Sequence, residues 1–313
     1  MSAPVPVTIV GGYLGAGKTT LINHLLRHAG SLRLAVLVND FGELAIDADL
    51  IEARGEDVIS IAGGCVCCSF GSDLMGALLK LQRIEPAPGQ VLIETSGVAL
   101  PGAVASAVRL VPGFAIDAVV VLADAETVRN RAADRYMGDT IERQLAQADL
   151  VVLNKVDLVA LREREGLVGW LGERAGAARI IEAARAQVPL EVLLGAGLVN
   201  SGAGAAGVQS AFGIRLPVEA ASRYESVSFP DPGPLRVRVL AQELARPELG
   251  LIRAKGVLRD ENGRLQILQV VGARFEVTDA PASLRAPSGC VCIGLKGMLD
   301  RTGLGRLFER TYV

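Results

Sequence analysis

Short apolar runs alternate with stretches of helical periodicity through the first half of the chain. The runs VPVTIV, LAVLVND, VLIETSG, AVVVLADA and LVVLNKVD begin at residues 5, 34, 91, 118 and 150. Nearly continuous apolar runs of this length are typical of strands buried on both faces of a parallel sheet. Segments such as KTTLINHLLRHAG and SDLMGALLKLQRI lie between them and carry apolar residues at helical spacing. The alternation predicts an α/β domain with a doubly wound, mostly parallel sheet, whose functional groups lie at the carboxyl ends of the strands.

A second, smaller region follows the α/β part of the chain. Residues 201–222 are rich in Gly, Ala and Ser and are interpreted as a linker between a domain at 1–200 and a domain at 223–313. In the later region ESVSF, LIRAKGVLRD, LQILQVVG and CVCIGL have strand character, and PLRVRVLAQELARP and DRTGLGRLFERTYV have helical character. DENG supplies a hairpin turn. We expect a small α+β domain. Cys290 and Cys292 alternate on a predicted strand and point to one face, where they could bind a metal, although packing in the core is favoured.

Charge and hydropathy argue against two classes of partner. The formal net charge is −2, so the chain has no basic footprint for a nucleic acid. No apolar run approaches the roughly 18 residues of a membrane span, and MSAPVPVTIVGG lacks the basic region of a signal peptide. Five cysteines without an export signal point to a reducing compartment. We therefore expect a cytoplasmic protein with no nucleic-acid or membrane partner.

GYLGAGKT fits the phosphate-binding motif G-x-x-x-x-G-K-[ST] of P-loop NTPases, between a predicted strand and a predicted helix. Its glycines let backbone amides turn inward around phosphate oxygens, and the helix N-terminus adds partial positive charge. The Lys18 ammonium is predicted to reach the β- and γ-phosphates, and the Thr19 hydroxyl to ligate Mg²⁺. The nucleotide-binding residues predicted here are Gly12, Leu14, Gly15, Ala16, Gly17, Lys18, Thr19 and Thr20.

Two further strand ends extend the predicted nucleotide site. NKVD supplies Asn154, Lys155 and Asp157. The Asp157 carboxylate can accept from guanine N1–H and the exocyclic amine, whereas adenine would face it with an acceptor, so the motif favours GTP over ATP. In VLIETSG, Glu94 stands where P-loop enzymes place a Mg²⁺-associated carboxylate, and the Gly97 amide is placed to contact the γ-phosphate.

Three of the five cysteines, Cys65, Cys67 and Cys68, crowd into the loop IAGGCVCCSF. A disulfide within so short a segment would be strained. The loop is compatible with a metal site, with a reactive thiol and with a buried structural cluster. His24 and His28 stand at i, i+4 on the helix after the P-loop, and we interpret them as ordinary surface residues of that helix.

Together these motifs resemble those of the CobW-like GTPases, a class related to the urease and hydrogenase nickel-insertion GTPases. GYLGAGKTTLINHLL, NDFGELAIDADLI, GGCVCC, ETSGVALPG and NKVDL match family motifs in order, and RAKGVLR and CVCIGLK match in the second domain. The resemblance implies a GTPase domain, a CobW-type C-terminal domain at 223–313 and the handling of a transition metal. The chain departs from the family at Asp40, where a glutamate is common, and its two histidines leave no His-rich segment.

Three thiolates and one further ligand would complete a tetrahedral zinc site. Glu43 is the preferred fourth ligand, ahead of Asp40 and Asp47, because the segment that contains it and the Cys loop are both expected near the γ-phosphate. Switch segments are ordered through phosphate and Mg²⁺ contacts. Coupling of about 1–3 kcal/mol between nucleotide and metal would change metal affinity roughly 5- to 150-fold.

We therefore expect a slow GTP-hydrolysing metallochaperone. It would bind GTP or GDP, Mg²⁺ and a transition metal, most readily zinc, and would serve an unidentified client metalloprotein. Lys18 and Glu94 are the predicted catalytic residues. The sequence shows no obvious arginine finger or water-positioning glutamine, so turnover by the isolated protein should be slow. A small-molecule P-loop kinase with structural cysteines and a non-enzymatic zinc or thiol sensor stay open as alternatives.

Overall fold

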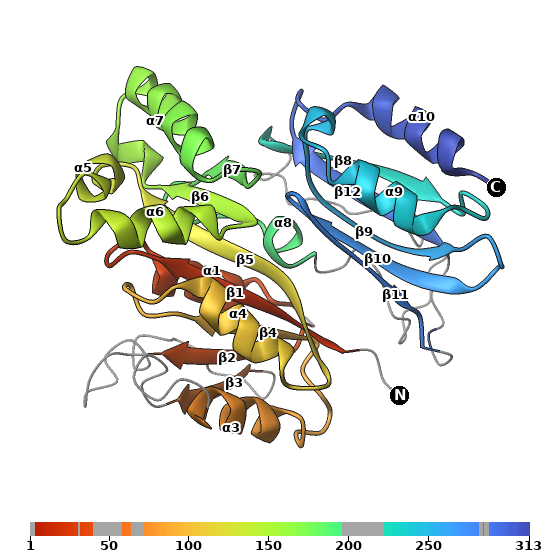
Figure 1. The fold of residues 1–313 in the computed structure, drawn as a ribbon, viewed down its shortest axis with the longest axis horizontal. Helices are drawn as coiled ribbons and strands as arrows, with labels where there is room; N and C mark the ends of the chain where they lie inside the picture. Colours follow the sequence, from red (N-terminus) through yellow and green to blue (C-terminus); the bar gives the residue numbers. More distant parts are fainter. Residues whose placement is uncertain are drawn as a thin grey trace. The chain divides into compact units, whose positions relative to one another are not determined.

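The computed structural model describes residues 4–30, 32–39, 58–63, 72–195, 222–281, 284 and 288–313. The chain forms two compact units, Pro4–Val188 and Pro189–Val313 (Figure 1). The predicted division at a 201–222 linker stays a prediction, because nearly all of that range lies outside the described residues.

The first unit is built on a parallel sheet, in which the described residues form seven strands in the order β3-β2-β4-β1-β5-β6-β7. All six neighbouring pairs are parallel. The strands are β1 Val5–Gly12, β2 Leu34–Asn39, β3 Val58–Gly63, β4 Gln90–Glu94, β5 Phe114–Asp124, β6 Leu150–Asn154 and β7 Arg179–Glu182. The five predicted strands are confirmed. The strands β3 and β7, at the two edges of the sheet, were not predicted.

Helices cover the sheet on both faces, which makes it doubly wound as predicted. They are α1 Lys18–Arg27, α3 Ser72–Leu81, α4 Pro101–Arg109, α5 Val128–Ala132, α6 Gly138–Ala146 and α7 Leu161–Arg174, with a 3₁₀ turn η1 at Val156–Leu158. Alternate strand residues such as Ile93 and Val121 share one core with α3, α4, α6 and α7. The intervening residues, such as Leu92 and Leu122, are equally buried. Burial on both faces explains why these strands are apolar without alternation.

The second unit contains an antiparallel sheet in the order β11-β10-β9-β12-β8 among its described residues. Its strands are β8 Tyr224–Pro230, β9 Leu251–Arg259, β10 Leu265–Val271, β11 Arg274–Asp279 and β12 Gly289–Leu295. Its helices are α8 Leu190–Leu194, α9 Val237–Leu244 and α10 Arg301–Thr311, with a 3₁₀ turn η3 at Pro247–Leu249. The predicted α+β character is confirmed, although β11 was not predicted.

Three details of this unit bear on the predictions. The DENG turn joins β9 to β10, with the Asp260 carboxylate accepting from the backbone N–H groups of Asn262 and Arg264. The Cys290 and Cys292 thiols are fully buried in the apolar core, as predicted. A hydrogen bond with Cys290, together with burial, raises the pKa of the Cys292 thiol well above its usual value. These two cysteines are therefore packing residues of the core.

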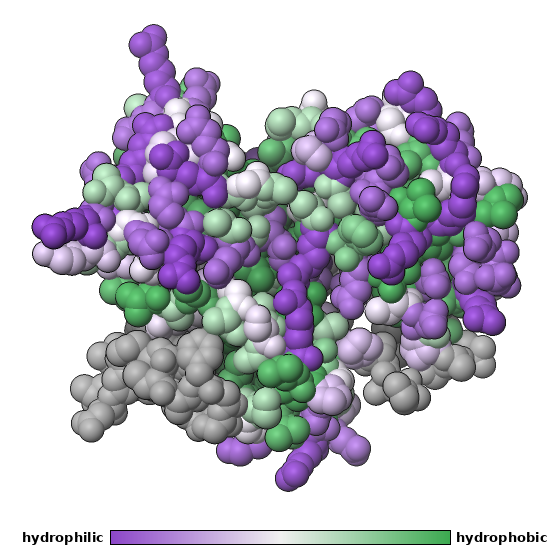
Figure 2. Space-filling model, viewed as in Figure 1, coloured by the Kyte–Doolittle hydropathy of each residue, from purple (hydrophilic) through white to green (hydrophobic). Residues whose placement is uncertain are grey.

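The face of the molecule in Figure 2 mixes hydrophilic side chains with small apolar areas. Exposed large apolar residues include Leu14, Leu110 and Tyr136. None of the helices formed by the described residues has the length and apolar character needed to span a membrane.

Candidate functional site

The loop between β1 and α1 holds a backbone conformation that depends on glycine. Gly12, Gly15 and Gly17 have φ angles of 127°, 77° and 103°. A Cβ atom at Gly12 would lie 2.4 Å from the Leu122 carbonyl oxygen, and one at Gly17 would lie 2.5 Å from Asn154 Nδ2. Glycine is therefore required at Gly12 and Gly17, because it tolerates a positive φ and leaves room for the close approach of β5 and β6. The loop has the compact form that a phosphate cradle requires.

Lys18 begins helix α1, and its side chain folds back over the loop. Lys18 is buried, and its Nζ lies 3.5 Å from the Tyr13 carbonyl oxygen. The N-terminus of α1 and the ammonium group therefore place positive charge at the same loop. Thr20, the other predicted residue of this turn, is exposed.

Thr19, in the first turn of α1, meets Glu94, the last residue of β4. The Thr19 hydroxyl donates to Glu94 Oε1 over 3.0 Å, and Glu94 is only 2% exposed. The pair is brought together because β1 and β4 are adjacent, with Val10 in register with Glu94. Hydroxyl and carboxylate oxygens are the hard ligands that Mg²⁺ prefers, so these residues fit the predicted ion.

The segment after β4 packs against the P-loop. A Cβ atom at Gly97 would lie 2.8 Å from the backbone nitrogen of Leu14, so the two segments approach too closely to leave room for a side chain there. The buried Gln144 of α6 donates its side-chain amide to the carbonyl oxygens of Gly97 and Ala99, over 3.1 and 2.8 Å. The sequence pattern did not single out Gln144.

Asn154 connects the P-loop to the loop after β7 at the carboxyl edge of the sheet. Its Nδ2 donates to the Ala16 carbonyl oxygen over 2.9 Å, and its Oδ1 accepts from the Ala186 backbone N–H over 2.7 Å. The side chain is 2% exposed, so both hydrogen bonds are buried. Asn154 thus joins two segments that the sequence places far apart.

Lys155 and Asp157 follow Asn154 in the turn that leads out of β6. Lys155 adopts a left-handed φ of 63°, and its Nζ lies 2.6 Å from Asp124 Oδ2 at the end of β5. Asp157 lies in η1 and is exposed. An exposed carboxylate beside this edge is accessible to a ligand, as reading a base would require.

The loop after β7 belongs to the site but was not predicted. Arg185 and Ala186 have φ values of 51° and 55°, which non-glycine residues adopt infrequently. This conformation directs the Ala186 N–H to Asn154. The sequence AARAQV carries no recognisable motif. Its one signal is the pair Ile180 and Ile181 before it, which marks another strand end at the same edge.

His24 also contacts this loop, which corrects the interpretation of the histidine pair as an ordinary surface. His28 is exposed, but His24 is half-buried, with Nε2 3.1 Å from the Val188 carbonyl oxygen. Burial, helped by the charge of the neighbouring His28, lowers the pKa of His24 below its ordinary value of 6.5.

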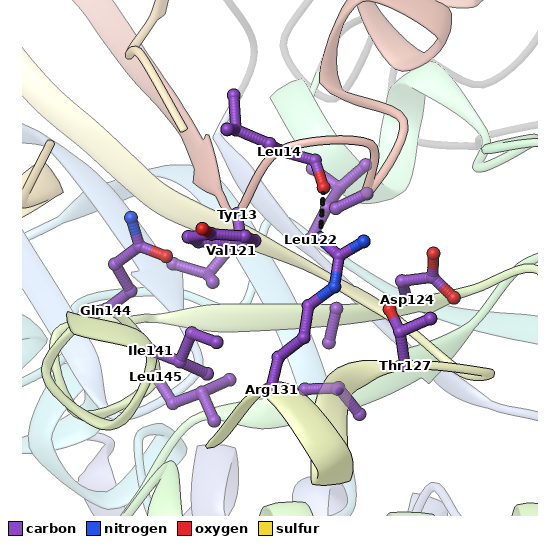
Figure 3. A pocket seen from close by; sticks show the side chains of 13 residues that line it. Tyr13, Leu14, Val121, Leu122, Asp124, Thr127, Arg131, Ile141, Gln144 and Leu145 are labelled. Atoms are coloured by element: carbon purple, nitrogen blue, oxygen red, sulfur yellow. Dashed lines mark hydrogen bonds between the residues drawn. The ribbon is translucent and has the colours of Figure 1, made fainter. Parts of the chain in front are cut away.

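A small pocket lies between the P-loop and helices α5 and α6 (Figure 3). Arg131 crosses it from α5, and its Nη1 donates to the Leu14 carbonyl oxygen over 2.6 Å. The guanidinium carbon also lies 5.1 Å from the centre of the Tyr13 ring, within cation–π range. Arg131, like Gln144, was not found from the sequence.

The predicted zinc ligands Cys65, Cys67, Cys68 and Glu43 lie outside the described residues, as do Asp40 and Asp47. Among the described residues, no group of three His, Cys, Asp or Glu side chains could hold a metal ion. The thiol site therefore stays a prediction.

Comparison with known proteins finds a matching family and several named relatives. The nucleotide-binding domain of the CobW/HypB/UreG family matches residues 6–182. A protein named zinc chaperone CobW from Pseudomonas aeruginosa is 37% identical over 229 residues, which cover 62% of this chain and 60% of that protein. The zinc chaperone YjiA of Escherichia coli is 35% identical over 171 residues, covering 51% and 52% of the two chains.

The chain thus spans less than two thirds of the length of these curated relatives in the matched regions. A solved structure, the Zn(II)-bound YjiA GTPase from E. coli, aligns over 99% of both chains at 20% identity and a TM-score of 0.47.

Proposed function

The chain belongs to the CobW/HypB/UreG family through its nucleotide-binding domain. We propose that it hydrolyses GTP and couples hydrolysis to the transfer of a transition metal, with zinc as the first candidate. The observation that carries the hydrolytic part is the contact of the Thr19 hydroxyl with the buried Glu94 carboxylate, 3.0 Å apart at the P-loop. This contact supports the proposal because two oxygen atoms suited to Mg²⁺ lie together next to the loop.

Mg²⁺ is the resident ion of this proposal, and Thr19 and Glu94 would hold it. Bound there, it supplies positive charge that offsets the charge of the β- and γ-phosphates. The backbone amides from Leu14 to Thr20 bind the phosphates, and Lys18 stabilises charge on the transferring phosphoryl group. A water attacks the γ-phosphorus, the bond to the β-phosphate oxygen breaks, and GDP and phosphate leave.

Guanine selectivity is assigned to Asp157, with Asn154 and Lys155 fixing the turn that carries it. Support comes from the two buried hydrogen bonds of Asn154 and from the 2.6 Å contact of Lys155 with Asp124. Each of them anchors the turn to a different neighbouring segment. A turn so fixed holds the exposed Asp157 carboxylate in one place, and a preorganised acceptor favours guanine over adenine.

Zinc is the cargo of this proposal, and Cys65, Cys67 and Cys68 with Glu43 are its proposed ligands. Support comes from the crowding of three thiols in four consecutive positions and from relatives that are named zinc chaperones. Zinc transfer would serve a client metalloprotein. If the nucleotide alters zinc affinity, zinc must alter nucleotide affinity by the same factor.

Hydrolysis of GTP and ATP by the parent and by Lys18→Ala tests the proposal, with Mg²⁺ present and zinc either supplied or chelated. We expect GTP to be hydrolysed in preference to ATP, slowly, and Lys18→Ala to lose activity by at least about 100-fold. We expect zinc to change the KM for GTP. Equal rates for the parent and Lys18→Ala would contradict the enzymatic proposal, and a KM unaffected by zinc would contradict the coupling.

A further inference from the structure

Arg131 is bound to the P-loop from the side of α5. Its Nη1 lies 2.6 Å from the Leu14 carbonyl oxygen, and its guanidinium lies over the Tyr13 ring at 5.1 Å. Figure 3 shows the side chain rising from α5 towards the loop, with the hydrogen bond to Leu14 at its end. A short charge-assisted hydrogen bond and a ring contact together fix two consecutive residues of the loop.

The direction of this carbonyl determines the direction of the next amide. In a trans peptide the C=O and the N–H of the same unit point to opposite sides. Since the Leu14 C=O points to Arg131, the Gly15 N–H points to the opposite side of the loop. Gly15 has a φ of 77°, and a Cβ atom there would meet no atom within 4 Å. Gly15 is exposed and a side chain there would meet open space, which leaves room beside the loop for a bound phosphate.

Glycine makes this peptide unit easy to rotate. A glycine occupies positive and negative φ almost equally, so nothing intrinsic to Gly15 maintains the orientation of the Leu14–Gly15 peptide. A rotated unit would turn its carbonyl oxygen towards the phosphate and its N–H away from it. The hydrogen bond from Arg131 opposes that rotation.

The charge of Arg131 is not offset by a carboxylate within ion-pair distance in the described part of the chain. The nearby acids have other partners: Asp124 accepts from Lys155 and the Glu126 backbone, and Asp134 accepts from the backbone N–H groups of Tyr136 and Met137. Lys18 Nζ meanwhile lies 3.5 Å from the preceding carbonyl, that of Tyr13. Two cations on consecutive carbonyls favour an anion at the loop.

Arg129 provides a contrast on the same helix. Its guanidinium donates to the Gly166 carbonyl oxygen and lies 5.9 Å from the centre of the Trp170 ring, both on α7. Arg129 thus resembles Arg131 in chemistry, with one carbonyl and one ring as partners, but among the described residues these partners lie on α7 and not on the P-loop.

We propose that Arg131 is a positioning residue of the phosphate site. It holds the Leu14–Gly15 peptide with the Gly15 N–H directed at the phosphates, and its charge adds to the positive potential behind the loop. This inference rests on the proposed nucleotide function. Without the tether the competent loop is only a fraction of the population, and apparent affinity falls by that fraction.

The test compares Arg131→Ala and Arg131→Lys with the parent and with Arg129→Ala. Affinities for Mg²⁺–GDP and for a non-hydrolysable Mg²⁺–GTP analogue are measured with fluorescent nucleotides, and single-turnover hydrolysis is followed with GTP. We expect Arg131→Ala to weaken nucleotide binding on the order of 10- to 100-fold, the factor that one hydrogen bond to a charged group represents. Lysine should restore much of the loss, and Arg129→Ala should stay within about twofold of the parent.

Rescue by guanidinium ion, added at low millimolar concentration, separates a positioning role of Arg131 from a purely structural one. If Arg131 only stabilised the fold, the added ion would not restore nucleotide affinity. We expect the ion to restore nucleotide affinity to Arg131→Ala and to leave Arg129→Ala and the parent unchanged, with sodium chloride as the salt control. Thermal unfolding without nucleotide should be similar in all four proteins.

Three results would overturn the inference. The first is unchanged affinity in Arg131→Ala. The second is a loss of affinity that follows lowered thermal stability and that neither lysine nor guanidinium restores. In both cases the parent still binds and hydrolyses GTP, so the proposed function stands. The third is a parent that binds no guanine nucleotide, which would overturn the inference together with the proposed function.

Discussion

Replacing Asn154 by alanine tests whether the buried side-chain amide of Asn154 holds the P-loop in place. The substitution removes the donor to the Ala16 carbonyl oxygen and the acceptor of the Ala186 N–H, which lie 2.9 and 2.7 Å from the side chain. Each buried polar group left without a partner costs about 1–3 kcal/mol. A water in the vacated space would recover part of that cost. We therefore expect the free energy of unfolding of the first unit to fall by about 2–4 kcal/mol, from two such groups.

The chain has one tryptophan, Trp170, and it lies on α7 in the first unit. Its fluorescence during urea denaturation therefore reports on this unit alone. A loss of about 2–4 kcal/mol in the free energy of unfolding should lower the urea midpoint by about 1 M. Asn154→Asp keeps the acceptor for Ala186 but turns an oxygen towards the Ala16 carbonyl, so it should also be destabilised.

Asn130→Ala, at an exposed position of α5, is the matched control and should stay within about 0.5 kcal/mol of the parent. Should Asn154→Ala unfold at the same urea concentration as Asn130→Ala, the reasoning that Asn154 ties these segments together would be refuted.

Three further perturbations follow from the same contacts. Gly17→Ala should abolish nucleotide binding in a fluorescence titration, because its φ is 103° and its Cβ would lie 2.5 Å from Asn154 Nδ2; a Kd within twofold of the parent would contradict the close packing. Glu94→Gln keeps an acceptor for Thr19 but removes the charge, so the Mg²⁺ concentration needed for half-maximal GTP hydrolysis should rise by about tenfold or more. An unchanged Mg²⁺ requirement would remove Glu94 from the ion site. Burial lowers the pKa of His24 on folding. Near and below pH 6.5 this residue therefore binds more protons in the unfolded chain than in the folded chain. Stability should therefore fall as the pH drops through 6.5, and His24→Gln should show a shallower decline in urea midpoint between pH 7.5 and 5.5; identical slopes would exclude this histidine as a cause.

The elements that carry local signals could be predicted from the sequence. The P-loop, Glu94 and Asn154 each follow an apolar run, and parallel strands bring all their carboxyl ends to one edge. The contact of Thr19 with Glu94 follows from that rule and from the adjacency of β1 and β4. The edge strands β3 and β7 were not predicted, because Ser60 and Gly63 interrupt the apolar run of β3 and β7 has only four residues.

The supporting residues could not be found in the same way. Arg131 meets Leu14 across 117 positions of the chain, and Gln144 meets Gly97 across 47. Neither residue lies in a motif, and the chain offers many arginines and glutamines of equal appearance. Ala186 contributes only its backbone N–H, and the presence of an alanine does not indicate the left-handed conformation that it adopts. Such contacts depend on tertiary placement, which single-sequence patterns do not encode.

The central claim is that nucleotide and zinc are coupled in one protein. A competition titration of zinc against a chelator tests it most directly, with the protein loaded with Mg²⁺–GDP or with a non-hydrolysable Mg²⁺–GTP analogue. A Cys65→Ala, Cys67→Ala, Cys68→Ala triple variant runs alongside. We predict one tight zinc ion that the triple variant loses, with an affinity that differs roughly 5- to 150-fold between the two nucleotides. Tight zinc with the same affinity in both nucleotide states, or no tight zinc at all, would contradict the account.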